Sequence, residues 1–91
     1  AFNVNLTNKC IEYIAAGCPD LRFLNVSFCF GIKDEFVDIL ASCIKLEELR
    51  LEHLIISPKY LHLIPVKFPN IAVIDIRHCI TINNKIILIR L

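Results

Sequence analysis

Glycine is scarce in this 91-residue chain: it has two, and no segment forms a glycine-rich loop that could cradle phosphate. No serine lies in the glycine-flanked turn that exposes a hydrolase nucleophile. The carboxylates within 34–38 stand at the expected start of a helix, where capping and solvation account for them. Tyr13, Phe36 and Ile39 are expected to pack in the core or against a neighbouring helix. The sequence therefore predicts no catalytic or cofactor-binding residue, and we expect no enzyme.

An excess of charge of one sign is also missing, because ten lysines and arginines nearly balance nine aspartates and glutamates. A nucleic-acid-binding domain is expected to gather basic residues into a patch, and the sequence has none. No apolar run reaches the roughly 18 residues that a membrane-spanning helix needs. We therefore expect no nucleic-acid partner and no membrane span.

The five cysteines lack the spacing of a zinc site or of a disulfide framework. No Cys-x-x-Cys motif occurs, and the cysteine count is odd. The interval from Cys29 to Cys79 is twice the interval from Cys18 to Cys43, so these cysteines recur at matching positions of a regular period, as small buried residues do. Cysteines without the spacing of a disulfide framework favour an intracellular protein, in the cytoplasm or nucleus.

A repeat of about 25 residues is what the sequence does contain. Leu24, Leu49 and Ile74 mark its equivalent positions, and a fixed period in this range is typical of stacked units. The chain is 56% hydrophobic, which is more than a closed domain of this size buries well. We therefore expect residues 1–91 to be one segment of two full and two partial repeats from a longer stack.

Each unit combines an alternating stretch, typical of a strand, with a stretch of helical spacing. Strands are expected at 21–27, 48–52 and 73–77. Helices are expected at 7–17, 32–41, 58–64 and 83–89. Thr7 is the expected N-cap of the first helix, and Gly17 with Pro19 is expected to end it. Asp34 is expected to cap the second helix or to place a negative charge in its first turn, and Pro65 is expected to stop the third.

The first full unit carries a recognisable motif. Cys18-Pro19, Leu21, Leu24, Val26 and Cys29, followed by Ile32 and a helix, resemble the cysteine-containing subtype of leucine-rich repeats. The third unit departs from it, with Leu54 in place of the second cysteine and Phe68-Pro69 in place of Cys-Pro. The resemblance implies an α/β leucine-rich-repeat solenoid. This is a right-handed β-α superhelix with short parallel strands on the concave face and helices on the convex face.

The same resemblance implies a protein–protein interaction module. The subtype is best known from F-box proteins, the substrate receptors of cullin-based ubiquitin ligases, in which the repeats bind the substrate and a separate F-box segment binds the ligase adaptor. No F-box is present in these 91 residues. The alternative is a structural subunit or assembly factor of a large complex, similar to a mitochondrial factor associated with ATP synthase. In either case we expect a protein partner, and further repeats or other subunits on the flanks.

If the strands pair in register with the period, equivalent residues lie side by side, about 4.8 Å apart. On the face away from the core this gives three ladders of candidate partner-binding residues: Phe23, Glu48 and Val73; Asn25, Arg50 and Asp75; Ser27, Glu52 and Arg77. Arg50 is then expected beside Asp75, and Glu52 beside Arg77. These pairs either neutralise one another on a solvated sheet or recognise polar groups of a partner.

His53 and His78 are also separated by one repeat length, each just past its strand. Two stacked histidines with Cys79 next in sequence resemble part of a metal pair or a pH sensor. A zinc site of this kind needs a second cysteine, and Leu54 occupies the position that matches Cys79. The sequence therefore predicts no metal site, and we interpret the histidine spacing as a consequence of the repeat.

Overall fold

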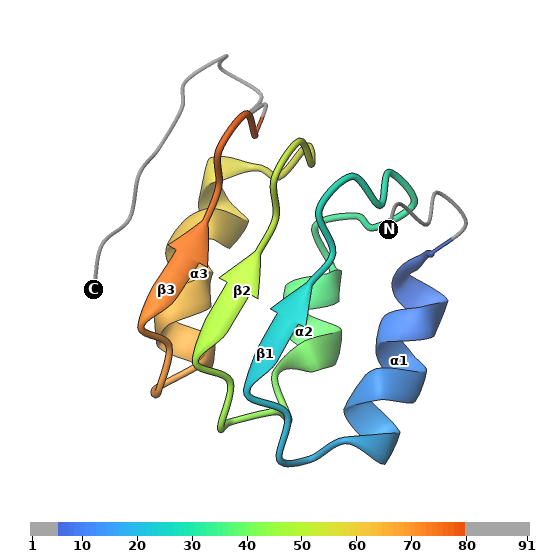
Figure 1. The fold of residues 1–91 in the computed structure, drawn as a ribbon, viewed down its shortest axis with the longest axis vertical. Helices are drawn as coiled ribbons and strands as arrows, with labels where there is room; N and C mark the ends of the chain where they lie inside the picture. The colour runs from blue at the N-terminus through green and yellow to red at the C-terminus, as the bar shows by residue number, and fades with distance from the viewer. Residues whose placement is uncertain (1–5, 80–91) are drawn as a thin grey trace.

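The computed structural model describes residues 6–79, in which helices and strands alternate along the chain. The elements are α1 (Asn8–Gly17), β1 (Phe23–Asn25), α2 (Phe36–Leu40), β2 (Glu48–Arg50), α3 (Pro58–Lys67) and β3 (Val73–Asp75). The strands form one parallel sheet in the order β1-β2-β3, with α2 and α3 behind it and α1 beside α2 (Figure 1). The described residues thus form a small two-layer α/β structure with an open sheet. The helix expected at 83–89 lies outside them.

Neighbouring strands pair in the register that the repeat predicts. Leu24 pairs with Leu49, and Leu49 pairs with Ile74. The paired stretches are shorter than expected, three residues each, but backbone bonds continue past them, as from Val26 N–H to the Arg50 carbonyl at 3.0 Å. Parallel strands need a crossover connection, and α2 and α3 supply one for each pair.

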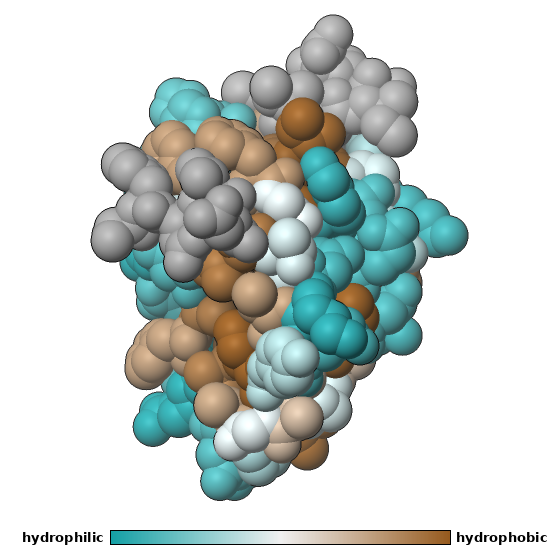
Figure 2. Space-filling model, turned by 90° about the vertical axis from the view of Figure 1, so that its right-hand side faces the viewer, coloured by the Kyte–Doolittle hydropathy of each residue, from teal (hydrophilic) through white to brown (hydrophobic). Residues whose placement is uncertain are grey.

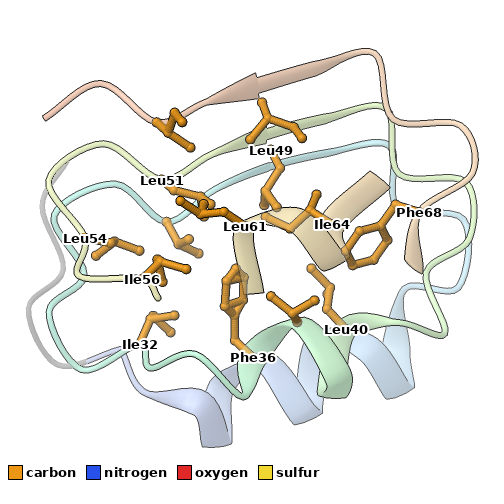
Figure 3. Close-up of a cluster of buried hydrophobic side chains, with 14 of the residues drawn as sticks. Ile32, Phe36, Leu40, Leu49, Leu51, Leu54, Ile56, Leu61, Ile64 and Phe68 are labelled. Atoms are coloured by element: carbon orange, nitrogen blue, oxygen red, sulfur yellow. The ribbon is translucent and has the colours of Figure 1, made fainter. Parts of the chain in front are cut away.

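The apolar core lies between the sheet and the helices (Figure 3). Its labelled members are Ile32, Phe36, Leu40, Leu49, Leu51, Leu54, Ile56, Leu61, Ile64 and Phe68, and all are buried. Burying a side chain of this kind contributes about 1.5–3 kcal/mol. The strands and helices are therefore stabilised chiefly by packing against one another.

The third helix is longer than the sequence predicts, because α3 continues through Pro65 to Lys67. Proline inside a helix removes one hydrogen bond and costs about 3 kcal/mol. Here it stands in the last turn, and the Phe68 N–H still donates to the Ile64 carbonyl at 3.0 Å. Leu61, Ile64 and Phe68 are all fully buried, and their burial outweighs the cost of the proline.

The second helix is shorter than the predicted 32–41, since α2 begins only at Phe36. The expected cap, Asp34, instead accepts a hydrogen bond from the Ser57 N–H at 2.9 Å, and the Lys33 N–H donates to Asn8 Oδ1 at 2.9 Å. Bonds to the units on either side therefore hold residues 33 and 34 outside the helix. Thr7 caps α1 as predicted, with its hydroxyl accepting from the Lys9 N–H at 3.3 Å.

All five cysteines are free thiols, and they differ in burial. Cys29, Cys43 and Cys79 are buried, as expected for matching repeat positions, whereas Cys18 is exposed at the C-cap of α1. Burial raises the pKa of the Cys79 thiol to about 11, and its Sγ donates to the Leu51 carbonyl at 2.9 Å. These contacts make the buried cysteines part of the core.

Two further expectations concern the helices. Phe36 is fully buried and Ile39 packs against the core, as predicted, but the Tyr13 side chain on α1 is 69% exposed. Tyr13 therefore does not belong to the described core. No helix within residues 6–79 combines the length and apolar character needed to cross a bilayer.

Candidate functional site

The sheet face opposite the helices carries all nine residues predicted as a partner-binding surface. We call this surface the open sheet face. It consists of Phe23, Asn25, Ser27, Glu48, Arg50, Glu52, Val73, Asp75 and Arg77. Side chains alternate along a strand, so these residues point outward while Leu24, Leu49 and Ile74 point toward the core. The strand register therefore brings the first two predicted ladders together.

Asp75 lies at the centre of a network of charges on this face. Arg50 Nη1 donates to Asp75 Oδ2 at 3.1 Å, which confirms the predicted pairing across β2 and β3. Arg50 Nε also donates to Glu48 Oε2 at 2.6 Å on its own strand. The Asp75 side chain is only 9% exposed, and hydrogen bonds from Arg77 lower the pKa of its carboxyl against the opposing effect of burial. The network therefore holds Asp75 ionised.

The third ladder also forms, just beyond the ends of the strands. Arg77 Nη2 lies 3.6 Å from Glu52 Oε1, as predicted, and the Glu52 N–H donates to Ser27 Oγ at 3.0 Å. The two arginines and their carboxylates thus form one connected network across the third and fourth units, which contain β2 and β3. Exposed ion pairs contribute little to stability, about 0–1 kcal/mol each. Their main effect is to fix the positions of the charged groups.

Apolar side chains flank the charged centre. Phe23 on β1 is 61% exposed and Val73 on β3 is 43% exposed, with Glu48 paired between them. The Arg22 guanidinium lies 5.9 Å from the centre of the Phe23 ring. An exposed aromatic side chain next to oriented charges is the arrangement that binding surfaces use to combine apolar contact with polar recognition.

A ladder of three aromatic rings lies beside this face, of which the sequence predicted the stacked His53 and His78 but not Phe28. The Phe28 and His53 rings stack with centroids 4.4 Å apart, and the His53 and His78 rings stack at 4.6 Å. All three residues have a left-handed backbone, with φ of 63°, 64° and 59°, which is uncommon for residues other than glycine. The signal was present in the sequence, because Phe28 precedes His53 by the same interval that separates the two histidines.

A hollow of about 540 Å³ opens between the loops that follow β1 and β2. Its rim includes Phe30 and Ile55, which are exposed and again occupy equivalent positions in successive units. Lys33, Asp34 and Glu35 also line it. No sequence pattern predicted this hollow, since the contour of a loop depends on how the units pack.

A comparison of the chain with protein-family models finds no matching family. A comparison with curated proteins finds no significant match. The candidate function therefore depends on the geometry and charge of the open sheet face.

Proposed function

We propose that this chain is a protein–protein interaction module of the leucine-rich-repeat type, and that its open sheet face binds a protein partner. The observation that carries the proposal is the alignment of three ladders, which sets apolar Phe23 and Val73 around the network of Arg50, Asp75 and Arg77. Such a surface suits a partner segment that offers both an apolar anchor and polar or charged groups.

The proposed architecture is a right-handed solenoid with the open sheet face on its concave side. Three observations support it: the strand register that follows the repeat, the helix between successive strands, and the same left-handed backbone at Phe28, His53 and His78.

Figure 2 views the molecule from the α1 side and shows hydrophobic surface between hydrophilic margins. Leu21 and Leu24 are only half-buried, as expected where another repeat or subunit would cover the core.

The biological context that we propose is the substrate-binding repeat region of an F-box/LRR-type ubiquitin-ligase receptor in the cytoplasm or nucleus. The support is the resemblance of the unit that begins at Cys18-Pro19, together with the open sheet face that such receptors present to a substrate. In this proposal the module contributes recognition, and ubiquitin transfer takes place on other components.

Site-specific photo-crosslinking tests the proposed surface. A photoreactive phenylalanine analogue replaces Phe23 on the open sheet face or, in the control, Val66 on α3, whose side chain is 74% exposed. Covalent adducts with a discrete protein are expected from position 23 and not from position 66. Arg77→Glu should remove the adduct formed at position 23, because it reverses a charge on that face. Adducts that form equally at both positions would contradict the proposal.

A second candidate function has its own supporting observation. Tyr13 and Val66 expose 69% and 74% of their surface on α1 and α3, away from the open sheet face. These apolar residues suit a structural subunit or assembly factor that contacts its complex through the helices, with a mitochondrial location as the alternative. An adduct at position 66 without one at position 23 would favour this second function.

A further inference from the structure

Three side chains with metal-binding atoms meet just past the ends of β2 and β3. Among residues 6–79, one ligand atom each from Glu52, His53 and His78 lie within 4.8 Å of one another. His53 Nε2 and Glu52 Oε2 are 3.9 Å apart. Cys79, the other candidate in this region, is buried and its Sγ bonds the Leu51 carbonyl. The available donors are therefore two imidazole nitrogens and one carboxylate oxygen.

Cross-strand backbone hydrogen bonds hold Glu52, His53 and the peptide that precedes His78 in place. The His53 N–H donates to the Arg77 carbonyl at 3.1 Å, and the Phe28 N–H donates to the Glu52 carbonyl at 2.9 Å. The Phe28 ring packs on the other face of the His53 ring. Cross-strand hydrogen bonds thus fix the backbone of the site, so metal binding needs the side chains to turn but little ordering of the backbone.

We propose that Glu52, His53 and His78 form a binding site for a divalent transition-metal ion, with Zn²⁺ the best fit. Two imidazoles and a carboxylate match the donor preference of Zn²⁺ and form a known three-ligand set with an open fourth position. Bonds of about 2.0–2.2 Å in a tetrahedron place donors about 3.3 Å apart, so the present 4.8 Å spread must contract by about 1.5 Å. The broad terminal torsions of histidine and glutamate allow such a movement.

Binding requires the two imidazoles to leave their parallel stack, because stacked rings direct their nitrogen lone pairs side by side rather than at one point. The rings are now 4.6 Å apart with 17° between their planes. Arg77 lies on the other side of the Glu52 carboxylate, with Nη2 3.6 Å from Oε1, while Oε2 faces His53. Glu52 Oε2 thus remains directed toward the metal position, while Arg77 orients the carboxylate through its contact with Oε1.

From the sequence, a zinc site at these histidines was expected to need a second cysteine. Glu52 supplies the third donor instead, and it was assigned only to the partner-binding ladder. The site goes beyond the proposed function, since metal binding would hold whether or not the open sheet face binds a protein.

Isothermal titration of the full chain with ZnCl₂ tests the site. We expect one ion per chain, with affinity reduced by about tenfold or more in His53→Phe, His78→Phe and Glu52→Gln. Phenylalanine is the chosen replacement because Phe28 already occupies the equivalent left-handed position. His62→Ala is the matched control, because His62 is exposed on α3 away from the cluster. It should bind Zn²⁺ as the wild-type chain does.

Two measurements on the wild-type chain keep the test independent of variant folding. Zn²⁺ should shift the imidazole NMR signals of His53 and His78 and leave those of His62 unchanged. Co²⁺ in place of Zn²⁺ should give no sulfur-to-metal charge-transfer absorption, whereas ligation by the exposed Cys18 thiol would produce it. Absent binding, equal affinity in all four variants, or thiolate absorption would each overturn the proposal.

Discussion

The Arg77 guanidinium donates two hydrogen bonds to the Asp75 carboxylate, from Nε to Oδ1 at 3.0 Å and from Nη2 to Oδ2 at 2.9 Å. Arg77 lies two residues after Asp75, just past the end of β3, so this contact is local, whereas Arg50 reaches the same carboxylate from β2. The Asp75 carboxylate therefore accepts hydrogen bonds from two arginines and, through Arg50, links two neighbouring units. Its ionisation is linked to the stability of the sheet.

Acidification is expected to weaken the fold partly through Asp75. The pKa of its carboxyl is lowered in the folded chain, mainly by hydrogen bonds from Arg77, relative to an unfolded value of about 3.9. A lowered folded pKa contributes stability above the unfolded pKa, and this contribution is lost as pH falls toward the folded pKa. Urea denaturation at a series of pH values should show it, and Asp75→Asn should flatten the profile below about pH 5. An unchanged profile in Asp75→Asn would contradict this assignment.

The two glycines should respond in opposite ways to alanine. A Cβ at Gly31 would lie close to the Leu6 carbonyl oxygen, at the bridge between Thr7 and residue 31, so Gly31→Ala should destabilise by about 1–3 kcal/mol. Gly17 is the last residue of α1, and a Cβ added there would meet no atom within 4 Å. Gly17→Ala should stabilise by about 0.5–1 kcal/mol. Thermal unfolding of both variants against wild type measures the contrast, and shifts of the same sign would refute it.

The two prolines of α3 form another matched pair. Pro65→Ala restores an N–H in the last turn and should stabilise the chain by about 1–2 kcal/mol after allowance for the freer unfolded state. Pro58 stands at the first helical position, where no backbone donor is needed, so Pro58→Ala should be neutral or destabilising by under about 1 kcal/mol. Urea midpoints compare the two. A loss of stability in Pro65→Ala would show that its ring packing matters more than the missing hydrogen bond.

The left-handed backbone at His53 predicts which replacements are tolerated. Asparagine adopts φ near 64° readily, whereas valine is strained there because its side chain branches at Cβ. His53→Val should therefore be less stable than His53→Asn by about 1 kcal/mol or more, although both lose the ring stack. Chemical denaturation in the presence of a chelator gives the difference. The same pair of changes at the exposed Ile55 serves as the control, where asparagine should hold no such advantage.

The sheet was predictable because strand register follows directly from a fixed repeat. Leu24, Leu49 and Ile74 adjoin as the spacing requires, and the contact of Arg50 with Asp75 follows from the same register. One period therefore determined the strand pairs and the residues that share the open sheet face.

The helix lengths and the aromatic ladder were harder to predict because distant contacts decide them. Because Phe68 is buried, α3 continues beyond Pro65. Asp34 does not cap α2, because its carboxylate accepts a hydrogen bond from the Ser57 N–H instead. The left-handed turns at residues 28, 53 and 78 contain no glycine, so no local signal marks them. Hydrogen bonds between units stabilise these turns, and a single segment cannot reveal such bonds.

The Cys79 thiol, four residues after the end of β3, is buried and therefore reacts poorly. With a pKa of about 11, its thiol is almost fully protonated in neutral solution and reacts slowly with alkylating reagents. Cys18, on the surface, offers a fast reference reaction in the same molecule. The labelling rate at Cys79 relative to Cys18 would therefore report how often the fourth unit, which contains Cys79, separates from the third, without any introduced probe.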